Sequence, residues 1–382
     1  MRTFTFKGLF LTAVFMLLGC LSIQAADDDL ITRQITIKLD KAGTLPDKIG
    51  SSKKNLITKL KIVGEVNGTD WCFIREMAGS GYDGKSTEGK LSVLDLSEAK
   101  IVEGGDYYNK YYYYENDVYY YKNCYTSNDV IGKCAFKGCS GLTSLTLPAG
   151  ITSIGDDAFY GCSGLTSITI PNGVTQIDKN AFRDCTGLTS LTLPANIKRI
   201  GESAFENCSG LTSLNLPAGI TTIGSSAFYG CSGLTSLTIP DGVTKIGKYA
   251  FSNCSYLTSL TIPSSVNSLG DYAFKNCSSL QSVHVSWSTP ISVGKAFNKA
   301  DVSKCTLYVP QGTEQDYFLA DVWGDFGNIV EYDPTGIDKV TTSTDAKELS
   351  RYSVNGQRLA TPTKGLNIVK YSDGSVKKVV VQ

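Results

Sequence analysis

Residues 139–161 read Cys-Ser-Gly-Leu-Thr-Ser-Leu-Thr-Leu-Pro-Ala-Gly-Ile-Thr-Ser-Ile-Gly-Asp-Asp-Ala-Phe-Tyr-Gly, and close variants of this stretch follow one another along the chain. One cysteine, one phenylalanine and one proline recur every 23 residues: Cys139, Cys162, Cys185, Cys208, Cys231, Cys254 and Cys277; Phe136, Phe159, Phe182, Phe205, Phe228, Phe251, Phe274 and Phe297; Pro148, Pro171, Pro194, Pro217, Pro240 and Pro263. A fixed period of about 20 to 30 residues is typical of a solenoid, in which each repeat contacts only its neighbours. The sequence therefore predicts stacked rungs and directs the search for function to exposed surfaces.

Within one rung, Leu142, Leu145 and Leu147 have the L-x-x-L-x-L spacing of a leucine-rich repeat strand. Thr143 and Thr146 fall between them and are expected to point outward. The proline has no N–H and ends the strand, and apolar residues further along return to the interior. A single rung buries too little apolar surface to offset its conformational entropy, so stacking and end caps are required.

Irregular copies of the strand pattern lie on both sides of the regular rungs. Upstream, Thr69-Asp70 is expected to cap a helix that runs through Met77, and downstream Thr313 is expected to start an amphipathic helix that reaches Trp323. We expect a β-rich, right-handed leucine-rich repeat solenoid of about ten parallel strands with two caps. The predicted segments are a signal peptide at 1–26, an N-terminal cap with a tyrosine-rich insertion at 27–130, regular repeats at 131–303, a C-terminal cap at 304–332, a linker at 333–350 and a small β module at 351–382.

The last segment has a strand pattern of its own. Residues 352–359 are predicted to form a hairpin on an Asn355-Gly356 turn, and residues 365–381 a second hairpin around Asp373-Gly374.

The N-terminal segment predicts export. Arg2 and Lys7 precede an apolar run and then small residues, which is the pattern of a signal peptide. Cleavage before Ala26 is one reading. The other is a lipobox ending at Cys20, whose acylation would hold the protein on a membrane. The apolar residues after Cys20 favour simple cleavage, and we expect a secreted protein or one on the outer cell surface.

The rung resembles the BspA-like leucine-rich repeats, whose 23-residue unit reads C-x-x-L-x-x-L-x-L-P-x-x-I-x-x-I-G-x-x-A-F-x-x. Seven consecutive rungs match it, and with the caps the likeness spans roughly residues 30–332. The resemblance implies an exported surface protein of anaerobic bacteria or protists that adheres to host proteins or other cells. The tail from Tyr352 to Gln382 is similar to the C-terminal sorting domains of the Bacteroidetes type IX secretion system.

The cysteine column has three readings: disulfides, metal ligands or core. Parallel rungs place equivalent side chains side by side about 4.8 Å apart, whereas a disulfide needs a specific mutual orientation and zinc needs four convergent ligands. Buried core is the favoured reading, with no metal site. Cys72, Cys124, Cys134 and Cys305 lie in the caps, where one disulfide stays open.

Two threonine columns are candidate binding strips. The predicted members are Thr143, Thr166 and Thr189 in one column and Thr146, Thr169 and Thr192 in the other. They lie on the face where leucine-rich repeats often bind partners. The alternative is that threonine simply suits an exposed strand.

A second candidate is the stretch from Tyr107 to Tyr125, where the period breaks down. Its predicted binding residues are Tyr107, Tyr108, Tyr111, Tyr112, Tyr113, Tyr114, Tyr119, Tyr120 and Tyr121. Tyrosine combines rigid apolar area with a hydroxyl at low entropic cost, which makes it common on recognition surfaces. We expect the stretch to project as a hairpin or loop; the alternative is a decorated cap that covers the flank of the solenoid.

The composition restricts the function classes. Without residues 1–26, which contain two basic residues and no acids, 34 basic and 36 acidic residues remain, so nothing favours nucleic acid as a partner. One histidine, His284, and an isolated carboxylate pair, Asp156-Asp157, provide no catalytic constellation. We expect a non-catalytic protein without cofactors that binds host matrix or cell-surface proteins. The alternative is a glycan-binding component of a nutrient-capture system.

Overall fold

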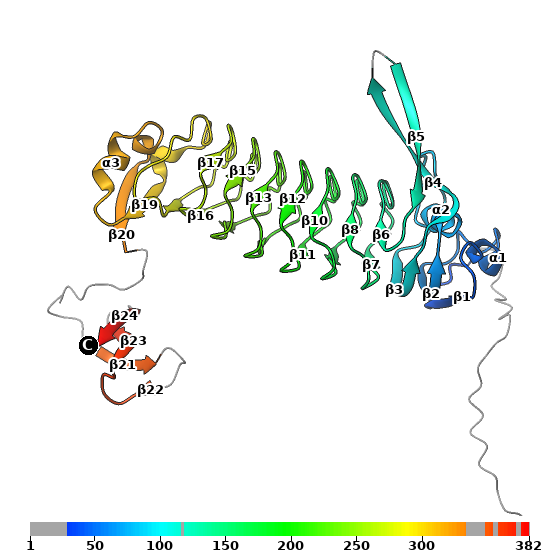
Figure 1. The fold of residues 1–382 in the computed structure, drawn as a ribbon, viewed down its shortest axis with the longest axis horizontal. Coiled ribbons are helices and arrows are strands. Elements are labelled where there is room, and N and C mark those ends of the chain that lie inside the picture. The colour runs from blue at the N-terminus through cyan, green and yellow to red at the C-terminus, as the bar shows by residue number, and fades with distance from the viewer. Residues whose placement is uncertain (1–28, 116–117, 334–347, 354–357, 372–375, 382) are drawn as a thin grey trace, which may run out of the picture.

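The computed structural model describes residues 29–115, 118–333, 348–353, 358–371 and 376–381. Within them the chain forms a solenoid of parallel strands with little helix, and the rungs lie side by side in one row (Figure 1). The predicted fold class is confirmed. The expected signal segment with Cys20 and the Asn355-Gly356 and Asp373-Gly374 turns lie outside the described residues.

One face of the solenoid carries the predicted strands. All of them pair in parallel, and equivalent residues of successive rungs face one another, as Ser167 and Ser190 do. They form two sheets: β1 (Ile35–Leu39), β2 (Lys59–Val66), β3 (Val93–Ile101), β7 (Ser144–Thr146), β9 (Ser167–Thr169) and β11 (Ser190–Thr192), then β14 (Ser236–Thr238), β16 (Ser259–Ile262), β18 (Ser282–Val285), β19 (Thr306–Pro310) and β20 (Asn328–Tyr332). The rung between them, residues 211–216, buries its leucines but has no strand in this part of the described chain. Eleven strands therefore stand where about ten were expected.

A second ladder of short strands lies on another side of the rungs, and the sequence did not predict it. It comprises β6 (Val130–Ile131), β8 (Ser153–Ile154), β10 (Gln176–Ile177), β12 (Arg199–Ile200), β13 (Thr222–Ile223), β15 (Lys245–Ile246) and β17 (Ser268–Leu269). Each strand is two residues long, so it is too short for the alternation that reveals a strand.

The interior is a file of phenylalanine rings. Neighbouring rings from Phe136 to Phe297 stack with centroids 4.7–5.6 Å apart and planes within 18° of parallel. The cysteine column runs beside it, and every member is buried and unpaired. From Cys162 to Cys277, each thiol donates to the carbonyl of the phenylalanine one rung before, at 3.1–3.4 Å. Burial raises the pKa of these thiols. These cysteines are packing residues, as expected.

The N-terminal cap contains α1 (Leu45–Ile49) and α2 (Gly68–Met77). The predicted cap at Thr69-Asp70 is wrong, because α2 begins earlier with Asn67 as its N-cap. The Asn67 side chain accepts from the backbone of Thr69 at 3.1 Å, and the Asp70 carboxylate accepts from the backbone N–H of Asn67 at 3.1 Å. Asp70 also accepts from the N–H of Leu45, so one buried carboxylate joins both helices.

The C-terminal cap contains η1 (Val302–Lys304), α3 (Glu314–Leu319) and η2 (Trp323–Asp325). The predicted continuous helix to Trp323 is wrong: α3 ends at Leu319, and Val322 has a φ of 69°. This break lets Trp323 turn inward and donate its ring N–H to the Ile291 carbonyl at 2.8 Å. Phe318, in α3, is exposed.

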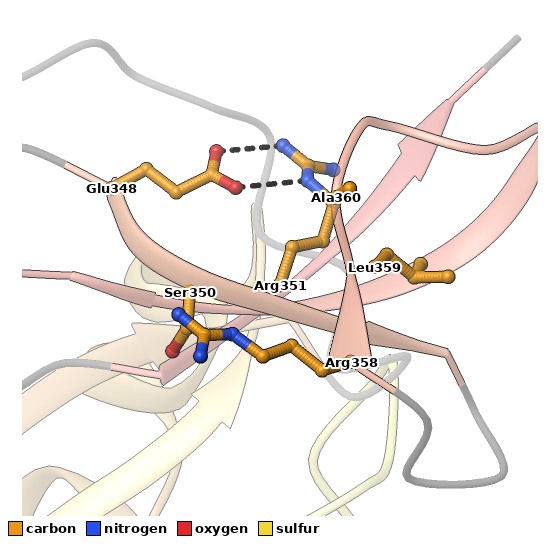
Figure 2. A pocket seen from close by; sticks show the side chains of 6 residues that line it. All are labelled: Glu348, Ser350, Arg351, Arg358, Leu359 and Ala360. Carbon is orange, nitrogen blue, oxygen red and sulfur yellow. Dashed lines mark hydrogen bonds and ion pairs between the residues drawn. The ribbon is translucent and has the colours of Figure 1, made fainter.

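The C-terminal module is an antiparallel sheet in the order β22 (Arg358–Leu359), β21 (Glu348–Ser353), β23 (Gly365–Tyr371) and β24 (Val376–Val381). It has a hollow of about 540 Å³. Figure 2 shows the side chains that line it, among them Arg351 and Glu348. The Arg351 guanidinium donates to the Glu348 carboxylate through two hydrogen bonds of 3.0 and 2.8 Å. Arg351 also donates to Asn367 at 3.3 Å. Through its bond to Asn367, Arg351 joins strands β21 and β23. Arg358, which is exposed, is the other basic residue that lines the hollow.

Candidate functional site

The tyrosine-rich stretch forms a long antiparallel hairpin of β4 (Gly104–Glu115) and β5 (Val118–Thr126). In Figure 1 it leaves the N-terminal end of the solenoid and extends away from the row of rungs. The hairpin form follows the sequence prediction. Among the described residues the two strands form a sheet of their own, with no third strand beside them.

The base of the hairpin is fixed to the solenoid by buried polar contacts. The Tyr108 hydroxyl donates to the Lys133 carbonyl at 2.9 Å, and the Asn109 amide donates to the Cys134 carbonyl at 3.1 Å. Both side chains are buried. Tyr108 was expected to bind a partner; this expectation is corrected, because the ring packs near Trp71, 6.4 Å between centroids, and serves as an anchor. The hairpin is therefore held in a defined direction.

One face of the hairpin pairs its own aromatic groups. Tyr113 stacks on Tyr120 with centroids 5.4 Å apart, and the two residues are cross-strand partners. The Lys133 ammonium lies 3.8 Å from the centre of the Tyr111 ring, and Lys122 lies 5.2 Å from that of Tyr113. These contacts stiffen the hairpin and leave the Tyr111 and Tyr113 rings only partly exposed.

The other face is open to solvent. We call it the tyrosine surface and define it as Tyr82, Tyr107, Lys110, Tyr112, Tyr121 and Tyr125. Tyr112 and Tyr121 are cross-strand partners and are 66% and 63% exposed. The Lys110 ammonium lies 5.1–5.4 Å from the centres of three rings, Tyr82, Tyr107 and Tyr121. This surface offers apolar area, hydroxyl groups and one cation on a rigid support.

Three members of this surface were not among the predicted binding residues: Tyr82, Lys110 and Tyr125, which ends the predicted stretch. Tyr82 lies outside the tyrosine run and reaches it because the Lys110 N–H donates to the Tyr82 carbonyl at 3.0 Å. Lys110 lies within the predicted stretch, beside Tyr111. No spacing signal could have found Tyr82, because the approach depends on how the chain returns after α2. Of the other predicted residues, Tyr114 and Tyr119 pair across the hairpin, and their side chains lie outside what the structure describes.

The first threonine column is used within the solenoid. The hydroxyls of Thr143, Thr166 and Thr189 donate to backbone carbonyls of the preceding rung at 3.0–3.1 Å. Each of these threonines lies just before its strand, so the outward strand positions are a serine, such as Ser144, and the second threonine, such as Thr146. Thr143 is exposed, as expected, but it lies one residue before the strand.

The second threonine column stays available. Thr146, Thr169 and Thr192 are exposed, and within the described residues their hydroxyls make no hydrogen bond to the protein. A shallow hollow of about 480 Å³ lies over residues 144–147 and 149 of one rung and residues 167–172 of the next. Further along, the same column passes to His284 and Tyr308, whose rings stack with centroids 4.2 Å apart. This face offers hydroxyl groups but little depth.

The carboxylate pair Asp156-Asp157 does not form an acid–base pair. Asp156 lies 3.6 Å from the Lys133 ammonium and Asp157 lies 3.2 Å from that of Lys137, so each carboxylate pairs with a lysine of the preceding rung. Among the described residues no cluster of three or more histidines, cysteines or acids is arranged to hold a metal ion. None of the helices in this part of the chain is long and apolar enough to cross a membrane.

The repeat can now be compared with known families. The model of the BspA-type leucine-rich repeat region matches six copies, over residues 109–232 and 204–314, which together cover more than half of the chain. The chain belongs to the BspA-type leucine-rich repeat family. The family and the solenoid fold support a repeat protein whose role is to bind other proteins.

Solved leucine-rich repeat proteins of bacteria are similar over part of the chain. The leucine-rich repeat protein of Treponema pallidum shares 33% identity, over 39% of this chain and 69% of that one, with a TM-score of 0.37. A leucine-rich repeat protein of Bacteroides ovatus shares 22% identity over 60% and 76%, with a TM-score of 0.34. The pneumococcal vaccine antigen PcpA shares 18% over 72% and 80%, with a TM-score of 0.42. No curated protein matches the chain.

Proposed function

We propose that this BspA-type repeat protein is exported to the bacterial cell surface and adheres there to a protein of the host matrix or of another cell. The tyrosine surface is the proposed contact. Export of the protein would depend on the signal segment at residues 1–26. The sorting-domain-like tail or acylation of Cys20 would then hold the protein at the cell surface.

The observation that carries the proposal is the exposed pair Tyr112 and Tyr121 on a hairpin whose base is buried and hydrogen-bonded. Exposed tyrosines on a rigid support lose little conformational entropy on binding. The first threonine column, in contrast, has its hydroxyl donors occupied by the backbone. The second column is exposed but offers little depth, so the hairpin is the better candidate of the two surfaces named from the sequence.

A glycan ligand is the second candidate, because exposed tyrosine rings can stack on sugars. The position of Lys110 favours a protein over a glycan: its ammonium lies over three of the rings, Tyr82, Tyr107 and Tyr121, and competes for the faces that a sugar would cover. The same cation would suit a partner that presents a carboxylate beside apolar groups.

Binding of the full chain to a panel of host matrix proteins, cells and immobilised glycans tests both candidates. We expect binding to a protein or a cell, and its loss when Tyr112 and Tyr121 are changed together to serine. Tyr256→Ser is the matched control, because Tyr256 is 65% exposed on a rung outside the hairpin. Binding to glycans alone would favour the second candidate, and binding that survives the double change would remove the hairpin from either.

A further inference from the structure

Two cysteines at the base of the hairpin differ from the cysteine column. Cys124 lies in β5 and Cys134 lies where the first regular rung begins, and both are buried and unpaired. Each of these two thiols shifts the pKa of the other, as close neighbours do, and the Cys134 thiol also donates to the Asp157 carboxylate at 3.9 Å. In the column, by contrast, each thiol from Cys162 onward donates to a phenylalanine carbonyl.

The surrounding contacts hold these two thiols together. Asn109 is the cross-strand partner of Cys124, and its amide donates to the Cys134 carbonyl at 3.1 Å. The Arg75 guanidinium donates to the same carbonyl at 2.9 Å from within the core. The Asn109 contact therefore ties the hairpin to the rung at Cys134, and the Arg75 contact ties α2 to the same residue.

The electrostatic environment distinguishes the two members. The neighbouring Cys134 lowers the pKa of the Cys124 thiol, with further lowering by Lys133, Arg75 and Lys137 against the opposing effect of burial. The pKa of Cys134 is raised by Cys124 and by burial. Because the thiolate is the nucleophile in disulfide exchange, Cys124 is the member suited to attack first.

We propose that Cys124 and Cys134 form a disulfide bond that fastens the tyrosine hairpin to the first rung. The Cys124 thiolate attacks one sulfur of a disulfide oxidant, forms a mixed disulfide and releases one thiolate. Cys134 then loses its proton to solvent, attacks the Cys124 sulfur and releases the second thiolate of the oxidant. The two cysteines together lose two protons and two electrons, and the oxidant is reduced to two thiols.

The bond would close a loop of the chain in which residues 125–133 lie between the two cysteines. A closed loop limits the open conformations of the hairpin base, so the direction of the tyrosine surface would be better defined when the pair is oxidised. The proposal rests on the proposed export only because export would bring the chain to a compartment that contains an oxidant. The bond itself is tested on the purified chain without a partner, so a failure to bind leaves it standing.

Peptide mapping gives a direct test. The full chain is equilibrated with glutathione that is mostly in its disulfide form, denatured with an alkylating agent and cut with trypsin. Cleavage after Lys122, Lys133 and Lys137 separates the two cysteines, since Cys124 falls in residues 123–133 and Cys134 in residues 134–137. We expect these two peptides to be joined and to separate on reduction. Finding both peptides alkylated, or Cys124 joined to another cysteine, would overturn the proposal.

Variants extend the test to the fastening of the hairpin. Native trypsin should cut after Lys110 and Lys122 more slowly in the oxidised than in the reduced chain, and Cys124→Ser should abolish this difference. Cys254→Ser is the matched control, because Cys254 belongs to the column and its loss should leave the joined peptides intact. If Cys124→Ser does not fold, the wild-type peptide map still decides. Equal cleavage of oxidised and reduced wild type would contradict the fastening.

Discussion

In a regular rung the first threonine is hydrogen-bonded to the preceding rung, whereas on the tyrosine hairpin Tyr112 and Tyr121 face solvent. The Thr166 hydroxyl donates to the Thr143 carbonyl at 3.1 Å, and this contact returns one rung later with Thr189. Tyr112 and Tyr121 stand exposed on a two-stranded ribbon. A repeated polar group in a stacked array is thus a poor guide to binding, because its own copy can satisfy it. The region that interrupts the repeat is the better guide.

The largest expected effect comes from the interior of the rungs. Phe205 is fully buried and stacks between Phe182 and Phe228, 5.2 and 5.3 Å away. Phe205→Ala should lower the free energy of unfolding by about 3–5 kcal/mol through lost burial and a cavity. Urea unfolding followed by circular dichroism measures this. Binding through the hairpin should be unchanged in the folded variant. A large loss of affinity would contradict the assignment of stability to the rungs and of binding to the hairpin.

The second prediction concerns the hairpin. Changing Tyr112 and Tyr121 together to serine should weaken binding of a protein partner by about 2 kcal/mol, roughly 30-fold in Kd. Both rings are exposed, so the unfolding midpoint should stay within the error of the wild type. Surface plasmon resonance and urea unfolding of the same preparations give the two values. Equal weakening of binding by Tyr256→Ser would contradict the assignment of the binding surface to the hairpin.

A smaller effect separates the two threonine columns. Thr166→Val removes the hydroxyl that donates to the Thr143 carbonyl, and should cost about 0.5–1 kcal/mol of unfolding free energy because the site is exposed. Thr169→Val in the same rung is the matched control, since its exposed hydroxyl makes no hydrogen bond to the described protein. Equal destabilisation by the two changes would show that the first column has no special structural role.

The smallest predicted effect is a pH dependence at the far end of the strand face. Burial lowers the pKa of His284 below its ordinary value of 6.5. The unfolded chain therefore binds this proton at a higher pH than the folded chain. The stability contributed by the neutral ring is present above pH 6.5 and is lost as the pH falls from there through the folded pKa.

Proton NMR can follow this titration directly, because His284 is the only histidine in the chain. His284→Phe keeps an aromatic ring beside Tyr308 and should remove this part of the pH dependence of thermal unfolding. A folded-state titration midpoint at or above 6.5 would be the contrary result.

Much of the fold could be predicted because the same apolar pattern recurs in successive rungs. The 23-residue recurrence of leucine, phenylalanine and cysteine indicated a solenoid, an inward face and the buried cysteines. The caps were harder because each occurs once: α2 begins at an Asn67 cap instead of Thr69, and α3 ends before Val322. The second ladder was missed because each of its strands has two residues.

For the candidate site, the sequence indicated the hairpin but not which of its residues face solvent. It placed Tyr108 on the binding surface, whereas the ring is buried and bonded to Lys133. It also left out Tyr82 and Lys110, which meet only in the folded chain.

The sequence by itself determined the period, the parallel stacking and the inward side chains, because a repeated apolar pattern can be buried only by stacking equivalent residues. The tertiary structure alone decided which threonines bond to the preceding rung, which tyrosines stay exposed, and that Cys124 lies beside Cys134. These features depend on the distance and direction between atoms of different segments. Such geometry is set by packing between segments and cannot be derived from the order of residues within one segment.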